Sequence, residues 1–204
     1  MIAIVNYNMG NLGSVQNAFD KIGAKAKIEN NPDRLKEYDK LVLPGVGAFG
    51  DAMAHLKEVG LDEAIKEYAK SGKYVMGTCL GMQLLFDKSQ EFGANEGLGL
   101  IEGEVVAFDK EKFDNKELKV PHMGWNEMFI QKEDTIFNGL PKDFYLYFVH
   151  SYHVVCNDKY ALGKTLYGYE FVSAVKKDNI YGFQPHPEKS HDKGLKILEN
   201  FVSL

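Results

Sequence analysis

The sequence is poor in cysteine and has no long apolar segment. Its two cysteines, Cys79 and Cys156, lie far apart, and the opening MIAIVNYNMGN has no basic stretch followed by a long apolar one. This pattern favours free thiols over a disulfide and predicts a cytoplasmic protein. A membrane-spanning helix needs about 20 consecutive, mostly apolar residues, and no such run occurs. The sequence therefore predicts no membrane partner.

Basic residues are also too few and too scattered to form a positive surface. The chain has 24 lysines and arginines against 29 aspartates and glutamates, and its net charge is −5. Proteins that bind nucleic acid usually gather basic residues on one face to neutralise phosphates. The sequence therefore predicts no nucleic-acid partner.

The spacing of the apolar residues divides the chain into two unlike halves. Before residue 92, strands expected at 1–7, 24–29, 40–43 and 73–76 alternate with helices expected at 12–22, 51–59, 62–71 and 80–88. Later residues favour strands at 101–108, 127–131, 144–152, 161–166, 171–176 and 180–184, with a charged, exposed loop at 110–119 and a closing helix at 192–202. Together they predict a single α/β domain over residues 1–204, with a largely parallel central sheet, helices on both faces and antiparallel strands added in the second half.

A cysteine flanked by glycines stands between an expected strand and an expected helix. The segment Gly77-Thr78-Cys79-Leu80-Gly81 has small residues on both sides of Cys79, which permit a sharp turn that exposes the central side chain at the carboxyl edge of the sheet. The positive end of the following helix stabilises a thiolate there. Cys79 is therefore a candidate nucleophile, although a buried structural cysteine at a tight turn fits the same pattern. Cys156 follows two valines and is most simply a buried structural thiol.

A second segment, Gln184-Pro185-His186-Pro187-Glu188, offers a base for that nucleophile. Pro187 favours an extended conformation at His186, so that the side chains of His186 and Glu188 can lie on the same side. His186 can then take the thiol proton while Glu188 orients the ring, as in a catalytic triad. The alternative is a surface loop that contains a histidine and a glutamate by chance.

The segment Gly45-Val46-Gly47-Ala48-Phe49-Gly50 contains the pattern G-x-G-x-x-G before an expected helix. A dinucleotide site would need this pattern in the first strand-to-helix turn and an acidic residue at a later strand end, and the sequence has neither. The backbone amides near Val46 and Gly47, together with that of Leu80, are better suited to hold an oxyanion. We therefore expect no nucleotide cofactor.

The histidines do not form a metal-binding pattern. His150 and His153 are three residues apart in or beside an expected strand, where their side chains would point to opposite faces. No cysteine pair or HExxH motif accompanies them. We expect no metal.

Longer segments resemble the class I, or triad, glutamine amidotransferases. The segments G-T-C-L-G-M-Q-L-L-F at 77–86 and H-P-E-K-S at 186–190 carry this resemblance. The segments M-G-N-L-x-S-V-Q-N-A-F at 9–19, P-G-V-G at 44–47, V-P-H-M-G-W-N at 120–126 and Y-F-V-H-S-Y at 147–152 narrow it to the glutaminase subunits of imidazole glycerol phosphate synthases. The resemblance extends from about residue 2 to the last helix. It implies a flavodoxin-like α/β fold and a cofactor-independent glutaminase of the histidine pathway.

The resemblance also assigns roles to individual residues. It implies a Cys79, His186 and Glu188 triad and an oxyanion hole at Val46, Gly47 and Leu80. The residues implied to hold glutamine are Gly47, Gln83, Glu91, Ser151 and Tyr152. Ammonia would pass to a (β/α)₈ barrel cyclase subunit. The residues implied to face that partner are His122, Met123, Trp125, Asn126 and Lys189.

The sequence departs from the family at a few positions. The family usually reads D-Y-G-M-G-N-L-R where this chain has Asn6, Asn8 and Gly13, and it prefers Phe where this chain has Pro185. The first loop lies near the synthase interface in the family. The substitutions there leave open a paralogous barrel partner that uses ammonia for sugar amidation in surface-polysaccharide synthesis. A stand-alone γ-glutamyl thiol hydrolase and a catalytically inactive binding subunit are two further hypotheses for the same sequence.

Overall fold

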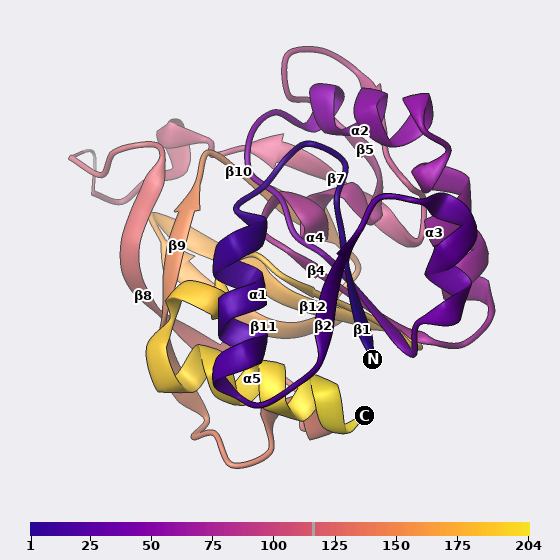
Figure 1. The fold of residues 1–204 in the computed structure, drawn as a ribbon. Helices are drawn as coiled ribbons and strands as arrows, with labels where there is room; N and C mark the ends of the chain where they lie inside the picture. The colour runs from indigo at the N-terminus through magenta and orange to yellow at the C-terminus, as the bar shows by residue number, and fades with distance from the viewer. Residues whose placement is uncertain (116) are drawn as a thin grey trace.

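The computed structural model describes residues 1–115 and 117–204, which form a mixed sheet flanked by helices (Figure 1). Its strands are β1 (Ile2–Val5), β2 (Ala26–Glu29), β3 (Lys40–Leu43), β4 (Tyr74–Thr78), β5 (Phe86–Ser89), β6 (Asn95–Glu96), β7 (Ile101–Ala107), β8 (His122–Ile130), β9 (Asp143–His150), β10 (Tyr152–Cys156), β11 (Ala161–Tyr167), β12 (Tyr169–Lys177) and β13 (Ile180–Phe183). Its helices are α1 (Leu12–Lys21), α2 (Phe49–Glu58), α3 (Leu61–Lys70), α4 (Leu80–Leu84) and α5 (His191–Ser203), with 3₁₀ turns η1 (Pro32–Glu37), η2 (Lys110–Lys112), η3 (Thr135–Phe137) and η4 (Pro187–Lys189).

The first half of the chain builds the parallel part of the sheet. The strands run in the order β2-β1-β3-β4-β13-β12-β10-β7-β5-β6, and β11, β8 and β9 extend the sheet from β12. The neighbours from β2 to β13 are all parallel, whereas most later pairs are antiparallel. This arrangement confirms the α/β fold predicted from the sequence. The last strand of the chain, β13, lies next to β4.

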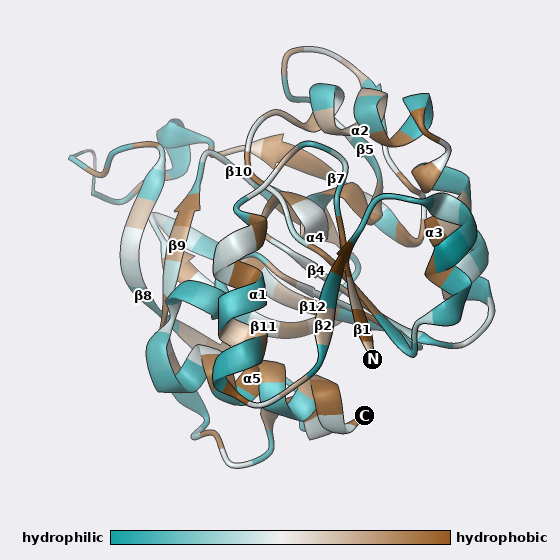
Figure 2. Ribbon diagram, viewed as in Figure 1, coloured by the Kyte–Doolittle hydropathy of each residue, from teal (hydrophilic) through white to brown (hydrophobic). Residues whose placement is uncertain are grey.

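Helices cover both faces of the parallel strands, with α1 and α5 on one face and α2 and α3 on the other (Figure 1). Alternate residues of β1 supply the two cores: Ala3 and Val5 pack with the α2 and α3 side, and Ile2 and Ile4 pack with the α1 and α5 side. Strands buried on both faces have no polar side, which explains their continuous apolar sequences. Figure 2 shows this as brown along β1 and teal on the outward turns of the helices.

The predicted helix at 80–88 is wrong in its second half. Helix α4 ends at Leu84, and Phe86 begins strand β5, which pairs in parallel with β7. Leu85 O accepts hydrogen bonds from Leu100 N at 2.8 Å and from Ile101 N at 3.0 Å. These distant backbone partners outweigh the local helical pattern, because a strand pairing supplies both hydrogen bonds and burial of Phe86.

Strand boundaries differ from the prediction in the second half. Strand β8 begins at His122 rather than at Glu127, because residues 122–129 pair in register with 143–150. The strand expected at 144–152 is two strands, with Ser151 between them. In the segment 110–119, expected as an exposed loop, Phe113 is buried against Tyr167 and Tyr169. Residue 116 of that segment lies outside the described residues.

Gly81 provides a test of the packing beneath the Cys79 turn. A Cβ on Gly81 would overlap the carbonyl oxygen of Leu43, whose strand β3 is paired to β4. We expect Gly81→Ala to lower the free energy of unfolding by about 2–3 kcal/mol, as overpacking against backbone does. Urea unfolding of the isolated chain measures this. As a control, a Cβ on Gly13 of helix α1 meets nothing within 4 Å, so Gly13→Ala should leave stability unchanged or raise it by about 0.5–1 kcal/mol. Equal midpoints for the two variants would contradict the packing argument.

Candidate active site

The two sequence segments that carry the candidate triad meet at one edge of the sheet. Strands β4 and β13 are parallel neighbours, with Thr78 opposite Phe183 in the register. Cys79 N donates a hydrogen bond to Phe183 O at 2.7 Å. The residues that follow the two strands therefore leave the sheet side by side at its carboxyl edge, where open α/β sheets bind their ligands.

Cys79 occupies a backbone conformation that few side chains tolerate. Its φ is 52° and its ψ is −115°, and a non-glycine residue with positive φ outside the left-handed helical region costs energy that the surrounding structure must supply. A Cβ on Gly77 would overlap Gly81 O, and one on Gly81 would overlap Leu43 O. The turn therefore needs glycine on both sides of the cysteine, as a nucleophile elbow does.

His186 and Glu188 form a buried pair beside the cysteine. His186 Nδ1 lies 2.7 Å from Glu188 Oε1, and both side chains are buried. Because the carboxylate accepts this hydrogen bond, Nδ1 carries a proton and Nε2 is left for the reacting group. The segment is fixed by His186 N, which donates to Tyr147 O at 2.9 Å, and by Ser190 Oγ, which donates to His186 O at 2.6 Å.

The charge state of His186 follows from its neighbours. Burial disfavours the charged ring, but Cys79 and Glu188 outweigh it and raise the pKa of His186 to about 10. Nε2 is buried and makes no hydrogen bond of ordinary geometry to any described residue, so it is free to exchange its proton with a substrate. The His186 ring is therefore protonated near neutral pH.

A cavity of about 310 Å³ opens above Cys79. It is lined by every residue that the sequence assigned to the oxyanion hole or to glutamine, namely Val46, Gly47, Leu80, Gln83, Glu91, Ser151 and Tyr152. Gln83 Nε2 donates to Tyr152 O at 3.1 Å and to Gln184 Oε1 at 3.0 Å. Glu91 Oε2 accepts from Phe49 N at 2.6 Å, and burial raises the pKa of Glu91. A partly buried carboxyl group at one end of the cavity is suited to an ammonium group.

The loop after β3 borders this cavity. Tyr7 Oη donates to Pro44 O at 2.5 Å, and burial raises the pKa of Tyr7 far above its ordinary value. Gly47 has a φ of 106°, and a Cβ there would lie 2.7 Å from Met9 Cε. The loop therefore favours glycine at position 47 for its backbone conformation, since the Met9 methyl group is the end of a flexible side chain that can move.

Other residues of the site were not anticipated from the sequence. Pro121, Val149 and His150 also line the cavity. The Cys79 sulfur lies 3.8 Å from Val149 O and 3.8 Å from Gln184 Nε2. Gln184 is fully buried, and its place beside the P-H-P-E segment was the only sequence signal for it. The contacts of Val149 and His150 depend on strand pairing, which no local pattern shows.

The expected partner-facing residues divide between two faces of strand β8. Met123 and Trp125 are 63% and 46% exposed, and Trp125 stacks on His191 with ring centroids 5.0 Å apart. His122, which was expected on the same surface, is 2% exposed and lies in the interior. Successive residues of a strand point to opposite sides, so His122 lies on the side of β8 opposite Met123 and Trp125. Asn126 and Lys189 are partly exposed.

The residues that depart from the family in the loop after β1 suit the conformation that they adopt. Asn8 has a φ of 64°, and asparagine is among the few non-glycine residues that adopt this region readily. Asn6 Oδ1 accepts from Asn8 N at 3.0 Å, a turn that aspartate makes equally well. Gly13 lies on the exposed side of α1. Pro185 is buried directly before His186, and nothing in the structure explains the proline there.

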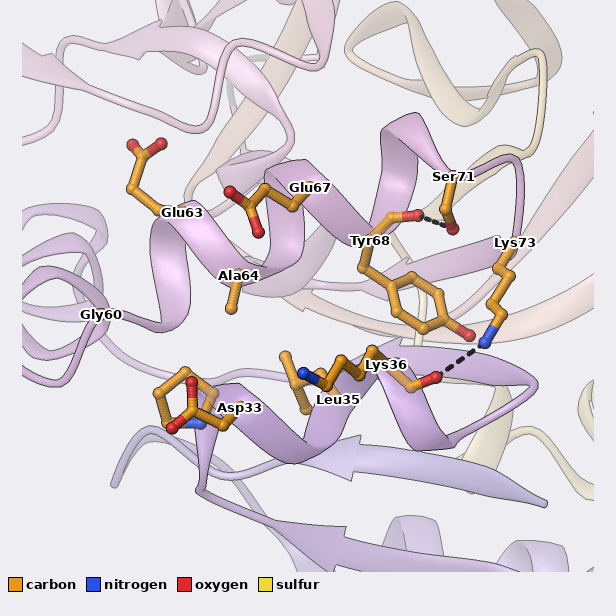
Figure 3. A pocket seen from close by; sticks show the side chains of 11 residues that line it. Asp33, Leu35, Lys36, Gly60, Glu63, Ala64, Glu67, Tyr68, Ser71 and Lys73 are labelled. Carbon is orange, nitrogen blue, oxygen red and sulfur yellow. Dashed lines mark hydrogen bonds between the residues drawn. The ribbon is translucent and has the colours of Figure 1, made fainter.

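A second cavity, of about 480 Å³, lies between η1 and α3 (Figure 3). Lys73 Nζ donates to Lys36 O at 2.8 Å and to Tyr38 O at 3.0 Å, and Tyr68 Oη also donates to Tyr38 O. These polar groups are used to hold η1 against α3. Lys73 precedes β4, so the cavity lies at the amino edge of the sheet, opposite Cys79.

Within the described residues, no group of three or more His, Cys, Asp or Glu side chains is arranged to hold a metal ion. The histidines at 150 and 153 lie on separate strands, β9 and β10. Across residues 1–115 and 117–204, no helix is both long and apolar enough to span a membrane.

Comparison with known proteins identifies the family. The model of the family "Glutamine amidotransferase class-I" matches residues 3–204. The chain belongs to the class I glutamine amidotransferases. It is 68% identical over 203 residues to "Imidazole glycerol phosphate synthase subunit HisH" of Sulfurimonas denitrificans, covering 99% of this chain and 97% of that protein. The protein of the same name from Wolinella succinogenes is 58% identical over 205 residues, with both chains fully covered.

Solved structures agree on the fold of this amidotransferase. The structure of PurLQS from Thermotoga maritima matches with a TM-score of 0.78 and 22% identity, covering 99% of this chain and 97% of that one. A chain described as a glutamine amidotransferase matches with a TM-score of 0.75 and 18% identity over the full length of both. The family and fold expected from the sequence are thus confirmed.

Three buried histidines make stability depend on pH. Burial lowers the pKa of His122 to about 4 and also lowers the pKa values of His150 and His153. An unfolded histidine binds a proton near pH 6.5, so the folded state loses stability as the pH falls from about 6.5. The raised pKa of His186 also stabilises the folded state. This contribution is complete below about pH 6.5 and is lost only as the pH rises toward 10, so it does not change the stability in the acid range.

We expect the free energy of unfolding to fall between pH 7 and pH 5, with His122 alone contributing on the order of 2 kcal/mol at pH 5. Urea unfolding at several pH values measures this. His122→Phe should be less stable at pH 7, but its free energy of unfolding should fall less between pH 7 and pH 5, because its unfolded state takes up one proton fewer. A variant whose stability falls as steeply as that of the unsubstituted chain would contradict a neutral buried His122.

Proposed function

We propose that this chain is the glutaminase subunit of an imidazole glycerol phosphate synthase, which hydrolyses glutamine and passes the ammonia to a (β/α)₈ barrel cyclase subunit in histidine biosynthesis. The observation that carries the proposal is the convergence of Cys79, His186 and Glu188 beneath a cavity lined by the residues expected to hold glutamine. The identity to relatives named as this subunit supports the pathway.

Glutamine hydrolysis would proceed in two steps. The Cys79 thiolate attacks the side-chain amide carbon, and the carbonyl electron pair moves to oxygen, where the amides of Val46, Gly47 and Leu80 stabilise the charge. His186 then gives its Nε2 proton to the leaving nitrogen, and ammonia departs from a γ-glutamyl thioester. In the second step His186 takes a proton from water, which attacks the thioester and releases glutamate and the thiolate. Glu188 holds the ring throughout.

The residues around the cavity would recognise the two ends of the glutamine molecule separately. The Glu91 carboxylate is suited to the α-ammonium group, and Gln83, Ser151 and Tyr152 border the rest of the cavity. A volume of about 310 Å³ lies at the small end of the range for ligand sites and fits a single amino acid. No cofactor is needed for this chemistry, because the thiolate supplies the nucleophile and His186 moves the proton.

An apolar strip connects the nucleophile to the surface. Met123 and Trp125 of β8 lie opposite Val149 and Tyr147 of β9 in the register, and Val149 O is 3.8 Å from the Cys79 sulfur. Alternate residues of paired strands share a face, so these four side chains line one side of the hairpin. We propose that the barrel subunit docks on this strip, with Asn126 and Lys189 at its margin, so that ammonia leaves under cover from water.

Competing functions fit the structure less well. A stand-alone γ-glutamyl hydrolase would have no use for the exposed apolar side chains of Trp125 and Met123 on β8. An inactive binding subunit would not need the strained backbone at Cys79. A barrel that uses ammonia for sugar amidation would suit the same docking strip, but the relatives with 68% and 58% identity are both named for the histidine enzyme.

The role of Cys79 is tested against the second cysteine. We expect Cys79→Ala to reduce glutamate release from glutamine by at least about 10³-fold, because no other group can form the thioester. The assay is run with the cyclase subunit and its ligand present. Cys156→Ala should be nearly silent, because burial raises the pKa of Cys156 to about 11 and keeps it protonated. Labelling of Cys156 rather than Cys79 by an electrophilic glutamine analogue would overturn the assignment.

The docking strip is tested with two variants of one strand. Trp125→Ala should weaken binding to the cyclase subunit by about 2 kcal/mol or more, as loss of an interface tryptophan does, and should release ammonia to solvent. Phe129→Ala, on the same side of β8 but away from Cys79 and 42% exposed, should bind normally. Calorimetry measures affinity, and thermal unfolding of the isolated chain measures stability. If Trp125→Ala loses much stability but binds the cyclase subunit with unchanged affinity, this strip is not the docking surface.

A further inference from the structure

Two buried histidines that take no part in the proposed chemistry lie on the side of β8 and β9 that faces away from the docking strip. His122 of β8 and His150 of β9 face each other in the strand register, and His122 Nδ1 is 3.0 Å from His150 Nε2. Both rings are buried. His150 borders the cavity, and His122 lies beneath the exposed residues of β8.

The partners at each end determine which nitrogen carries each proton. His150 Nδ1 lies 2.8 Å from Tyr152 O, which can only accept, so His150 donates from Nδ1. The other nitrogen of a neutral ring then accepts, and His122 must donate to it from its own Nδ1. His122 Nε2 is therefore an acceptor, and the Asn126 amide, 3.2 Å away, donates to it. All three hydrogen bonds run in one direction, from Asn126 to Tyr152.

Packing holds both rings in place. His122 is stacked between Phe148 and Tyr167, with ring centroids 4.8 Å and 3.9 Å away and interplanar angles of 22° and 23°. Phe108 packs against His150 at 5.2 Å. Burial lowers the pKa values of both histidines. Both rings are therefore neutral near neutral pH, which is the form that these three hydrogen bonds require.

Each end of this series of hydrogen bonds lies next to a region with a proposed function. Tyr152 O accepts a second hydrogen bond from Gln83 Nε2, and both residues line the glutamine cavity. At the other end, Asn126 follows Trp125 in β8, and its amide also donates to Leu166 O at 3.0 Å. The chain of hydrogen bonds therefore ties the wall of the cavity to the strand that carries the docking strip.

We propose that His150 and His122 are positioning residues for glutamine binding. They fix the Tyr152 carbonyl and, through it, Gln83, and they connect this wall of the cavity to strand β8. The proposal rests on the proposed function for the identity of the substrate. The histidines act through Tyr152 and Gln83 and exchange no proton with glutamine, so their loss should affect the affinity for substrate more than the rate of the chemical step.

Two variants of His150 separate its hydrogen bond from its bulk. The amide nitrogen of asparagine can occupy the place of Nδ1 and donate to Tyr152 O, whereas the longer glutamine side chain carries its amide near the place of Nε2. We expect His150→Gln to raise KM for glutamine by about 10-fold with kcat changed less than about 3-fold, in keeping with the loss of one buried hydrogen bond. His150→Asn should stay within about 3-fold of the unsubstituted KM.

His153→Gln is the matched control. His153 is also buried and packs on Phe108 at 4.8 Å, but its Nε2 bonds to Tyr169 Oη at 2.8 Å and it does not line the glutamine cavity. Its substitution should leave KM unchanged. Equal KM values for His150→Gln and the unsubstituted enzyme, or an equal rise in His153→Gln, would overturn the proposal.

A measurement without substrate tests the proton arrangement even if a variant does not fold. Nitrogen-15 NMR of the unsubstituted chain should show both rings as Nδ1–H tautomers at pH 7, with assignment by His122→Phe. An Nε2–H tautomer at either ring would contradict the direction assigned to the hydrogen bonds from Asn126 to Tyr152. If instead the unsubstituted chain with its cyclase subunit releases no glutamate, the proposed function fails, whereas the NMR result still decides the hydrogen-bond arrangement.

Discussion

The close approach of helix α4 to strands β3 and β4 is the constraint on which the rest of the site depends. Gly81 lies against the Leu43 carbonyl, and Gly77 lies against the Gly81 carbonyl, with no room for a side chain at either position. The turn between them must therefore be sharp, and Cys79 takes the strained conformation at its apex. Two largely buried strands and a buried helix hold it there, so that the strain is offset by packing elsewhere in the structure.

The candidate triad also depends on the place of β13 in the sheet. Because β13 runs parallel to β4 at its side, the P-H-P-E segment leaves the same edge as Cys79, although more than half of the chain separates them. Pairing of β8 with β9 then brings Val149 beside the sulfur and Tyr147 beside the backbone of His186. The site is thus assembled from strand ends, and small errors in register would displace every member of it.

Local sequence predicted those features that depend on local chemistry. The turn at 77–81, the extended segment at 186 and the strand at 40–43 follow from glycine, proline and apolar residues whose effects act within a few positions. The strand β5 and the early start of β8 depend on partners distant in the chain, so the helical pattern at 80–88 was misleading. The resemblance assigned His122 to the partner surface together with Met123 and Trp125, and the side of a strand that each residue occupies is known only once the pairing of the strand is known.

Four buried histidines show how partners decide the charge of chemically identical groups. His186 faces a carboxylate and a sulfur, and its pKa rises to about 10. His122, His150 and His153 have no such anion among the contacts that shift them, and burial lowers their pKa values. A positive ring beside Cys79 and neutral rings behind the cavity wall serve different needs, because a charged His150 could no longer accept the hydrogen bond from His122. The separation of charged from neutral histidines therefore keeps the protonated ring beside Cys79 apart from the hydrogen bonds that we propose to fix the wall of the cavity.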